Sequence, residues 1–218
     1  HGHRRRQGDR AQMSRLTRRT TYAAIGAVWL AAIAAGALSG LADTFGPPPL
    51  GKHLEYSTTV LDRDGQLLRA YLTDEGRWRL PATPDDVDPR FIEALLAYED
   101  KRFFSHHGVD PLAMMRAAYQ FVTQGHIVSG GSTISMQVAR LLEDGTTGQI
   151  AGKLRQMRVA WALERRLGKD RVLDLYLTHA PYGGNLEGVR AAAQAWFGKP
   201  PARLDAHEAA LLVALPQS

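Results

Sequence analysis

An uncharged apolar run near the N-terminus constrains this chain more than any other feature of its sequence. From Thr20 to Ala42 no residue is charged, and Tyr22 to Leu41 consists almost wholly of Ala, Leu, Ile, Val, Gly and Trp. About 20 such residues span the core of a bilayer as one helix. A cleavable signal peptide is the alternative, because small residues fill Gly36 to Ala42, but signal cores run only about 7–15 residues. We therefore expect an uncleaved transmembrane anchor over 21–42.

The charges that flank this run predict its orientation. The first twenty residues hold one acid, Asp9, and seven arginines: Arg4, Arg5, Arg6, Arg10, Arg15, Arg18 and Arg19. Arginine-rich flanks stay on the cytoplasmic side of a membrane. We expect a basic cytoplasmic tail over 1–20 and the remainder of the chain outside. This topology accounts for the net charge of +5, so we expect no nucleic acid partner.

Beyond the anchor, strand signals give way to helix signals. Asp64-Gly65 separates two β-rich stretches, 57–61 and 66–71, which predicts a hairpin that Trp78 extends. We assign 43–85 to a linker and hairpin region and 86–218 to a mainly α domain. Helices are expected over 88–98 and 111–122, over 134–142 and 153–167, from 172, over 188–196 and after 205, with Asp88 and Asp205 as N-caps. The chain has no cysteine, which excludes disulfides and thiolate metal sites.

The stretch that follows the first of these helices carries two adjacent acids. Phe91 and Leu95 lie on its apolar stripe, and Glu99 is the next residue on that stripe. A carboxylate on the buried side of a helix end suits a general base. The alternative is a frayed end at which Glu99 and Asp100 pair with the two basic residues after them.

Three later segments each allow two interpretations. Ser132 or Thr133 is either an N-cap or part of an anion site at a helix start, where no Walker-type lysine follows. The basic helix 153–167 is either a solvated face or a site for a diphosphate or anionic lipid headgroups, and Gly168 ends it. The Met and aromatic face of 111–122 either contacts lipid or packs into the core, and we expect core packing.

Four ordered stretches carry a resemblance to a known family. Glu99-Asp100 with Phe103, His106 and Gly108 matches Glu-Asp-x-x-Phe-x-x-His-x-Gly, and Gly131-Ser132-Thr133-Ile134 with Gln137 matches a second motif. Gly168-Lys169-Asp170 with Leu173 and Leu175-Tyr176-Leu177 matches Lys-Asp-x-Ile-Leu-x-x-Tyr-Leu. The last matches are Tyr182-Gly183, Gly188, Ala191-Ala192 and Phe197-Gly198-Lys199. Over 57–218 the chain resembles the peptidoglycan glycosyltransferase domain of class A penicillin-binding proteins, glycosyltransferase family fifty-one, and is most similar to their 1C type.

The resemblance implies a fold, a reaction and a set of site residues. The fold is lysozyme-like and largely α-helical. The reaction polymerises lipid II into β-1,4 glycan strands with inversion and releases undecaprenyl diphosphate. Glu99 is the base that takes the acceptor proton, and Asp100 assists it. The substrate-binding residues implied are Phe103, His106, Ser132, Thr133, Gln137, Arg140, Lys153, Gln156 and Arg158.

One residue departs from the family pattern. The third motif of the family usually ends in glutamate, whereas Gln156 stands here and carries no charge. No protein ligand set for a metal is expected, and Mg²⁺ or Mn²⁺ is the only cofactor left open. A transpeptidase domain is expected after Ser218.

The resemblance also implies a place in the cell and a set of partners. We expect a single-pass protein of the bacterial inner membrane, with its catalytic domain on the periplasmic or extracellular side. The partners would be lipid II, the growing glycan, the membrane and other cell wall synthesis proteins. Two other functions stay open: a non-catalytic glycan or lipid II-binding scaffold, which Gln156 favours, and a lysozyme-like hydrolase.

Overall fold

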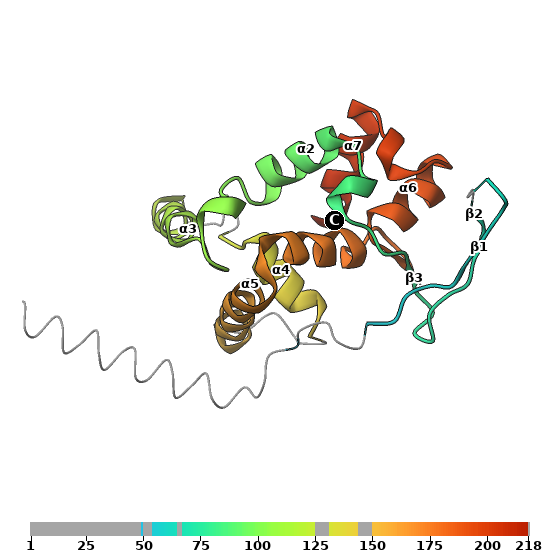
Figure 1. Ribbon diagram of the computed structural model, residues 1–218. Coiled ribbons are helices and arrows are strands. Elements are labelled where there is room, and N and C mark those ends of the chain that lie inside the picture. The colour runs from blue at the N-terminus through green and yellow to red at the C-terminus, as the bar shows by residue number, and fades with distance from the viewer. Residues whose placement is uncertain (1–48, 50–53, 65–66, 125–130, 144–149, 218) are drawn as a thin grey trace, which may run out of the picture. The chain divides into compact units, whose positions relative to one another are not determined.

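The structure is a computed structural model that describes residues 49, 54–64, 67–124, 131–143 and 150–217. These residues belong to one unit, Pro48–Ser218. The unit is mainly helical, as the sequence predicts (Figure 1). Its elements are β1 (Thr59–Leu61), β2 (Leu67–Ala70), β3 (Trp78–Arg79), η1 (Pro84–Asp86), α2 (Pro89–Glu99), η2 (Phe103–Ser105), α3 (Pro111–Gln124), α4 (Ile134–Leu141), α5 (Ile150–His179), β4 (Leu186–Glu187), α6 (Val189–Phe197), η3 (Pro201–Arg203), α7 (Ala206–Ala214) and η4 (Leu215–Gln217).

The predicted tail and anchor, 1–42, lie outside the described residues, so the membrane span and its orientation stay predictions. Among the helices that the structure describes, none combines the length and the hydrophobicity that a membrane crossing requires.

The predicted hairpin is confirmed, but the place predicted for Trp78 is wrong. Strands β1 and β2 pair antiparallel, with Thr59 opposite Ala70. Trp78 lies instead in β3, which pairs in parallel with β4 in a separate two-stranded sheet. The amide of Trp78 donates to the Asn185 carbonyl at 2.8 Å. Arg79 Nε donates to Glu187 Oε2 at 2.6 Å. The sheet therefore joins segments more than a hundred residues apart, and no local sequence pattern indicates this pairing.

The capping residues define the helix starts as the sequence predicts. Asp88 Oδ1 accepts from the backbone amide of Arg90 at 2.9 Å at the start of α2. Asp205 accepts from the amides of His207 and Glu208 in a capping box at the start of α7. Both caps satisfy amides that would otherwise lack a partner in the first helical turn.

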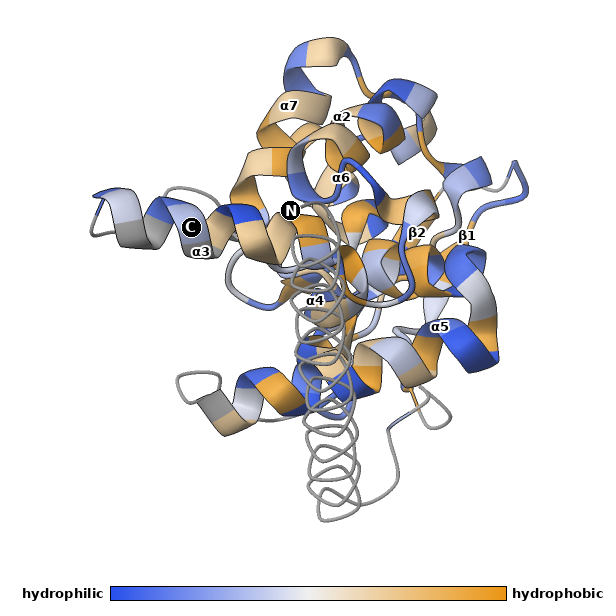
Figure 2. Ribbon diagram, turned by 90° about the vertical axis from the view of Figure 1, so that its left-hand side faces the viewer, coloured by the Kyte–Doolittle hydropathy of each residue, from blue (hydrophilic) through white to orange (hydrophobic). Residues whose placement is uncertain are grey.

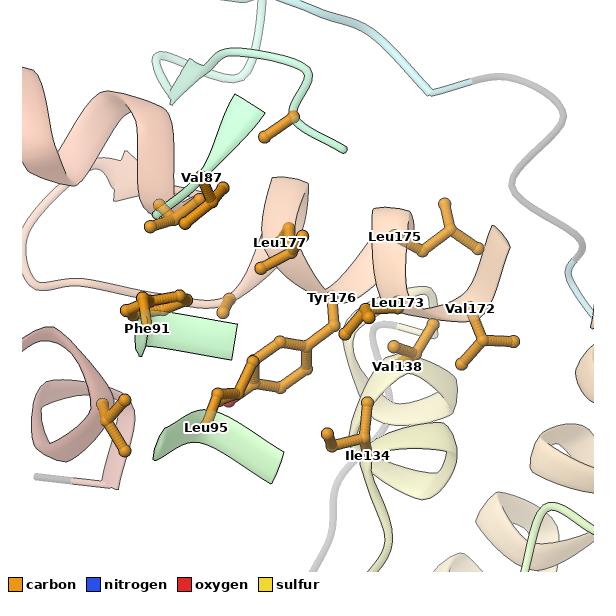
Figure 3. Close-up of a cluster of buried hydrophobic side chains, with 14 of the residues drawn as sticks. Val87, Phe91, Leu95, Ile134, Val138, Val172, Leu173, Leu175, Tyr176 and Leu177 are labelled. Atoms are coloured by element: carbon orange, nitrogen blue, oxygen red, sulfur yellow. The ribbon is translucent and has the colours of Figure 1, made fainter. Parts of the chain in front are cut away.

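The core lies where α2, α4, α5 and α7 pack together. Phe91 and Leu95 of α2 are fully buried, as is Leu177 of α5. Figure 3 shows the Tyr176 ring of α5 reaching toward Leu95, with Ile134 of α4 nearby. Burying a Leu or Phe side chain contributes about 1.5–3 kcal/mol. This packing fixes the end of α2, and with it the position of Glu99.

The apolar face of α3 does not pack into the core, so that expectation is wrong. Leu112, Met115 and Tyr119 are 56%, 60% and 71% exposed. A Cβ on Gly131 would lie 3.3 Å from the Met114 Cα, so the opposite side of α3 is the one that contacts the protein. Figure 2 shows α3 extending away from the other helices, with both hydrophobic and hydrophilic residues along it. The side of α3 that carries Met114 and Ala117 therefore packs near Gly131, whereas Leu112, Met115 and Tyr119 face outward.

Helix α5 consists of two helices joined at Gly168, as the sequence predicts. Gly168 has φ 79° and ψ 172°, a conformation that is essentially restricted to glycine. The break at Gly168 changes the direction of the helix just before Lys169.

Candidate active site

Glu99 is the last residue of α2 and is half-buried. Gln137 Nε2, from α4, donates to Glu99 Oε2 at 2.7 Å. Burial, and next the negative charge of Glu99, raise the pKa of Tyr176 well above its ordinary value. Tyr182, fully buried close by, is affected in the same direction. The carboxylate of Glu99 thus lies at the edge of an aromatic core and is oriented by an amide.

The frayed-end alternative for the two acids is not what the structure contains. Asp100 is buried, and both of its carboxylate oxygens lie 3.0 Å from His106 Nε2. Its Oδ2 also accepts from the amide of Ile134 at 3.0 Å. Arg102 pairs with Asp110 through Nε at 3.0 Å. Asp100 therefore links the loop after α2 to the first residue of α4.

The residues between α2 and α4 hold that loop against α5. Phe103 is buried, and its ring meets the His106 ring edge to face at 6.3 Å. Gly108 has φ +73°, and a Cβ there would lie 2.6 Å from the Trp161 amide nitrogen. Only glycine permits this approach of the two backbones.

The sequence left open whether Ser132 and Thr133 cap α4 or belong to an anion site. In the structure their two hydroxyls have different contacts. Thr133 is the N-cap: its Oγ1 accepts from the Met136 amide at 3.1 Å and donates to the Gly108 carbonyl at 2.6 Å. Ser132 is half-buried, and its Oγ accepts from Lys153 Nζ at 2.6 Å. Thr133 is thus structural in this arrangement, and Ser132 faces the cationic residues.

A cavity of about 220 Å³ lies beside Ser132. Its walls come from α4, from α5 and from Ser132 before α4: Ser132, Met136, Gln137, Arg140, Lys153 and Gln156. Burial, and next the positive charge of Arg140, lower the pKa of Lys153. Gln156 is buried, and its Oε1 accepts from Lys153 Nζ at 3.3 Å. Two cations in one cavity, with hydroxyl and amide groups around them, suit a phosphate group.

The lining of this cavity does not fit a divalent cation. Such ions prefer carboxylate oxygens, and the six lining residues include two cations and no acid. Within the ranges that the structure describes, no group of three or more His, Asp or Glu side chains could hold a metal ion. The neutral amide of Gln156 stands where an acid would be needed.

Most of the predicted site residues lie around the cavity or directly behind it. Arg158 is the exception: it is half-buried, its Nη1 is buried without a hydrogen-bond partner among the described residues, and it does not line the cavity. Its predicted contact with a diphosphate stays a prediction. The sequence patterns assign no role to Glu164 or Lys169, although Lys169 begins the match to the Lys-Asp-x-Ile-Leu-x-x-Tyr-Leu motif. Both lie beside His106, with Lys169 Nζ 3.4 Å and Glu164 Oε1 3.9 Å from His106 Nδ1.

Comparison with known proteins gives one family. Residues 64–218 match the family described as Transglycosylase. The chain is similar to penicillin-binding protein 1C of Escherichia coli, with 46% identity over 177 residues, which is 81% of this chain and 23% of that protein. Penicillin-binding protein 1A of the same organism is 37% identical over 76% of this chain and 19% of its own length. Biosynthetic peptidoglycan transglycosylase of Acinetobacter baumannii is 38% identical over 60% of this chain and 58% of its length. The chain thus spans less than a quarter of the penicillin-binding proteins it matches.

Proposed function

We propose that this chain, which belongs to the transglycosylase family, polymerises lipid II into β-1,4 glycan strands and releases undecaprenyl diphosphate during cell wall synthesis. The name of the Acinetobacter baumannii relative, a biosynthetic peptidoglycan transglycosylase, supports the substrate class. The observation that carries the proposal is the double role of Gln137, which binds Glu99 and also lines the cavity that holds Arg140 and Lys153. This contact supports a general base next to an anion site.

We propose the following reaction for that arrangement. The diphosphate of the growing chain occupies the cationic cavity, and the 4-hydroxyl of the incoming lipid II faces Glu99. Glu99 takes the hydroxyl proton while the acceptor oxygen bonds to the donor anomeric carbon, and the bond from that carbon to the diphosphate breaks. Attack from the face opposite the leaving group inverts the anomeric carbon. General base catalysis contributes about 10²–10⁴-fold to rates of this kind.

The electron pair of the broken bond moves onto the diphosphate. Lys153 and Arg140 lie where they stabilise that charge, and fixed charges of this type commonly supply the largest part of catalysis. Ser132 orients Lys153 through its 2.6 Å hydrogen bond. Because Gln156 is neutral, neither cation is offset by an acid among the lining residues.

The proposed location is the bacterial inner membrane, with the catalytic domain outside the cytoplasm. The relatives named penicillin-binding proteins support a cell wall enzyme. The exposed large residues of α3, Leu112, Met115 and Tyr119, support a contact between this domain and lipid. A substrate with a polyprenyl tail requires an active site close to a bilayer.

A gel assay of labelled lipid II tests the function. The detergent-solubilised chain is compared with Glu99→Gln and with Glu93→Gln, which changes an exposed acid of the same helix. We expect a glycan ladder from the unmodified chain and from Glu93→Gln, and none from Glu99→Gln.

Two other outcomes point to the other functions. Lipid II binding without a ladder favours the non-catalytic scaffold, for which Gln156 is the supporting residue. Release of short fragments from isolated peptidoglycan favours a hydrolase.

A further inference from the structure

We propose that Glu164 and Lys169 are positioning residues for Glu99. They act through a series of polar groups, Glu164, Lys169, His106 and Asp100, that ends at the first turn of α4. The inference rests on the proposed function, because it assumes that Glu99 is the general base.

Glu164 is the start of the series. Its carboxylate is 5% exposed, and its Oε1 accepts from Lys169 Nζ at 2.6 Å and from Ser135 Oγ. Its Oε2 is buried and, within the described part of the chain, has no hydrogen-bond partner. A buried carboxylate with one unpaired oxygen is a poor source of stability, because the cost of removing it from water is only partly recovered. Its presence is better explained by what it holds in place.

Lys169 reaches Glu164 only because the helix is interrupted between them. In a continuous α-helix, residues five apart point about 140° away from each other around the axis. The break at Gly168 returns Lys169 to the side of Glu164. There its ammonium lies 4.3 Å from the centre of the Phe103 ring and 3.4 Å from His106 Nδ1. Glu164 and the ring together hold the cation against the histidine.

His106 lies between Lys169 and Asp100 and contacts both. Its Nε2 lies 3.0 Å from both Asp100 oxygens, which can only accept, so Nε2 carries the hydrogen. In the neutral ring Nδ1 is then the acceptor, and Lys169 donates to it. Lys169 therefore supports the same tautomer of His106 that Asp100 requires, by donating to its free Nδ1.

The series ends on α4, which carries the partner of Glu99. Asp100 Oδ2 accepts from the amide of Ile134, the first residue of α4, at 3.0 Å. Ser135, the second residue, donates back to Glu164. The first turn of α4 is thus held from both ends of the series. Gln137 follows on the same helix and donates to Glu99 at 2.7 Å. Small displacements of catalytic groups have large effects on rate.

Kinetics of Glu164→Gln and Lys169→Met test the proposal. The matched control is Arg171→Met, which removes a half-exposed cation that pairs with Asp174 on the same helix. We expect kcat for lipid II to fall at least about 10-fold in both variants while KM changes less than about 3-fold, because the cavity that binds substrate is intact. Lys169→Arg should recover part of kcat, and Arg171→Met should retain it.

A second readout does not depend on activity. ¹⁵N NMR of the histidine rings distinguishes the two neutral tautomers, and the His106 signals are identified by their loss in His106→Gln. We expect the Nε2–H tautomer in the unmodified chain, and a displaced Nδ1 resonance in Lys169→Met, where the donor to Nδ1 is lost, but not in Arg171→Met.

The outcomes separate this inference from the proposed function. Unchanged kcat in Glu164→Gln and Lys169→Met, in a chain that polymerises lipid II, overturns the positioning role and leaves the function standing. A different negative result is a loss of thermal stability in Glu164→Gln and Lys169→Met in proportion to their loss of kcat, with no rescue by Lys169→Arg. That result would reduce the pair to a structural role and also overturn the positioning role. If the unmodified chain makes no polymer, the function fails, and an unchanged Nδ1 resonance of His106 in Lys169→Met then rejects the series on its own.

Discussion

Gln137 Nε2 donates to Glu99 Oε2 at 2.7 Å, which joins the end of α2 to the middle of α4 across 38 residues of sequence. The same amide side chain lines the cavity that holds Arg140 and Lys153. The proposed base and the proposed leaving-group site therefore share one residue.

Gln137→Ala removes this hydrogen bond and should lower kcat for polymerisation by about 10–100-fold, because the carboxylate of Glu99 loses its orientation. Steady-state kinetics with labelled lipid II provide the measurement. Gln194→Ala on α6 removes an amide that neither lines this cavity nor donates to Glu99, and this variant should keep the original kcat. A normal kcat in Gln137→Ala would show that Glu99 needs no such partner.

Lys153 should make diphosphate binding sensitive to alkaline pH. Its pKa is lowered by burial and by Arg140, so its ammonium loses the proton at a lower pH than the ordinary value of 10.5. The affinity for inorganic diphosphate, measured by calorimetry from neutral pH upward, should fall as the pH rises through that lowered pKa. Lys153→Arg keeps its charge and should move the fall to higher pH. An identical pH profile in that variant would exclude Lys153 as the titrating group.

Chelation should leave polymerisation largely unchanged. The cavity lining contains two cations and no acid, so charge on the diphosphate is balanced by protein groups. We expect EDTA to change the rate less than about 3-fold. Gln156→Glu places an acid beside Lys153 and should weaken inorganic diphosphate binding at least about 10-fold, partly recovered by Mg²⁺. Loss of polymer on adding EDTA to the unmodified chain would contradict this expectation.

His179 should make the fold sensitive to acid. Burial lowers its pKa, its Nδ1 lies 2.8 Å from the Leu175 carbonyl, and its buried Nε2 has no hydrogen-bond partner among the residues that the structure describes. Below the ordinary value of 6.5 the unfolded chain binds a proton that the folded chain does not. The free energy of unfolding should therefore fall with decreasing pH, by at most about 1.4 kcal/mol per pH unit, down to the lowered pKa.

Urea denaturation between about pH 5 and pH 8 measures this slope. His179→Gln should flatten it, whereas His207→Gln, at a fully exposed histidine, should not. A slope that is the same in His179→Gln as in the unmodified chain would assign the acid sensitivity to another group.

Helix α3 should contact lipid through its exposed face. The chain has no cysteine, so Met115→Cys can carry a single environment-sensitive dye. We expect a blue shift of its emission when the chain is placed in anionic phospholipid vesicles. The same dye at Arg203→Cys, an exposed position of η3, should report water. Equal spectra at the two positions would remove α3 from the membrane contact.

Much of this protein is determined by short stretches of its sequence. Asp88 and Asp205 cap their helices where the pattern places them, and the two strands of the hairpin pair around the Asp-Gly signal. Glu99 ends the apolar stripe of α2, and Gly168 ends a helix. Each of these features depends on residues within a few turns of one another, so periodicity, caps and glycine conformation suffice to predict it.

The tertiary structure decided which partners these segments have. Trp78 pairs with residues more than a hundred positions away, and α3 packs through the side that carries Met114 and Ala117 while Met115 and Tyr119 stay exposed. Ser132 and Thr133, neighbours in sequence, face a cavity and a backbone carbonyl respectively. Glu164 contacts Ser135 only because α4 packs against α5, and it contacts Lys169 only because α5 is interrupted at Gly168. Local patterns place a charge on a helix, but the free energy of burying that charge depends on which groups from distant segments surround it, and those are known only once the chain is folded.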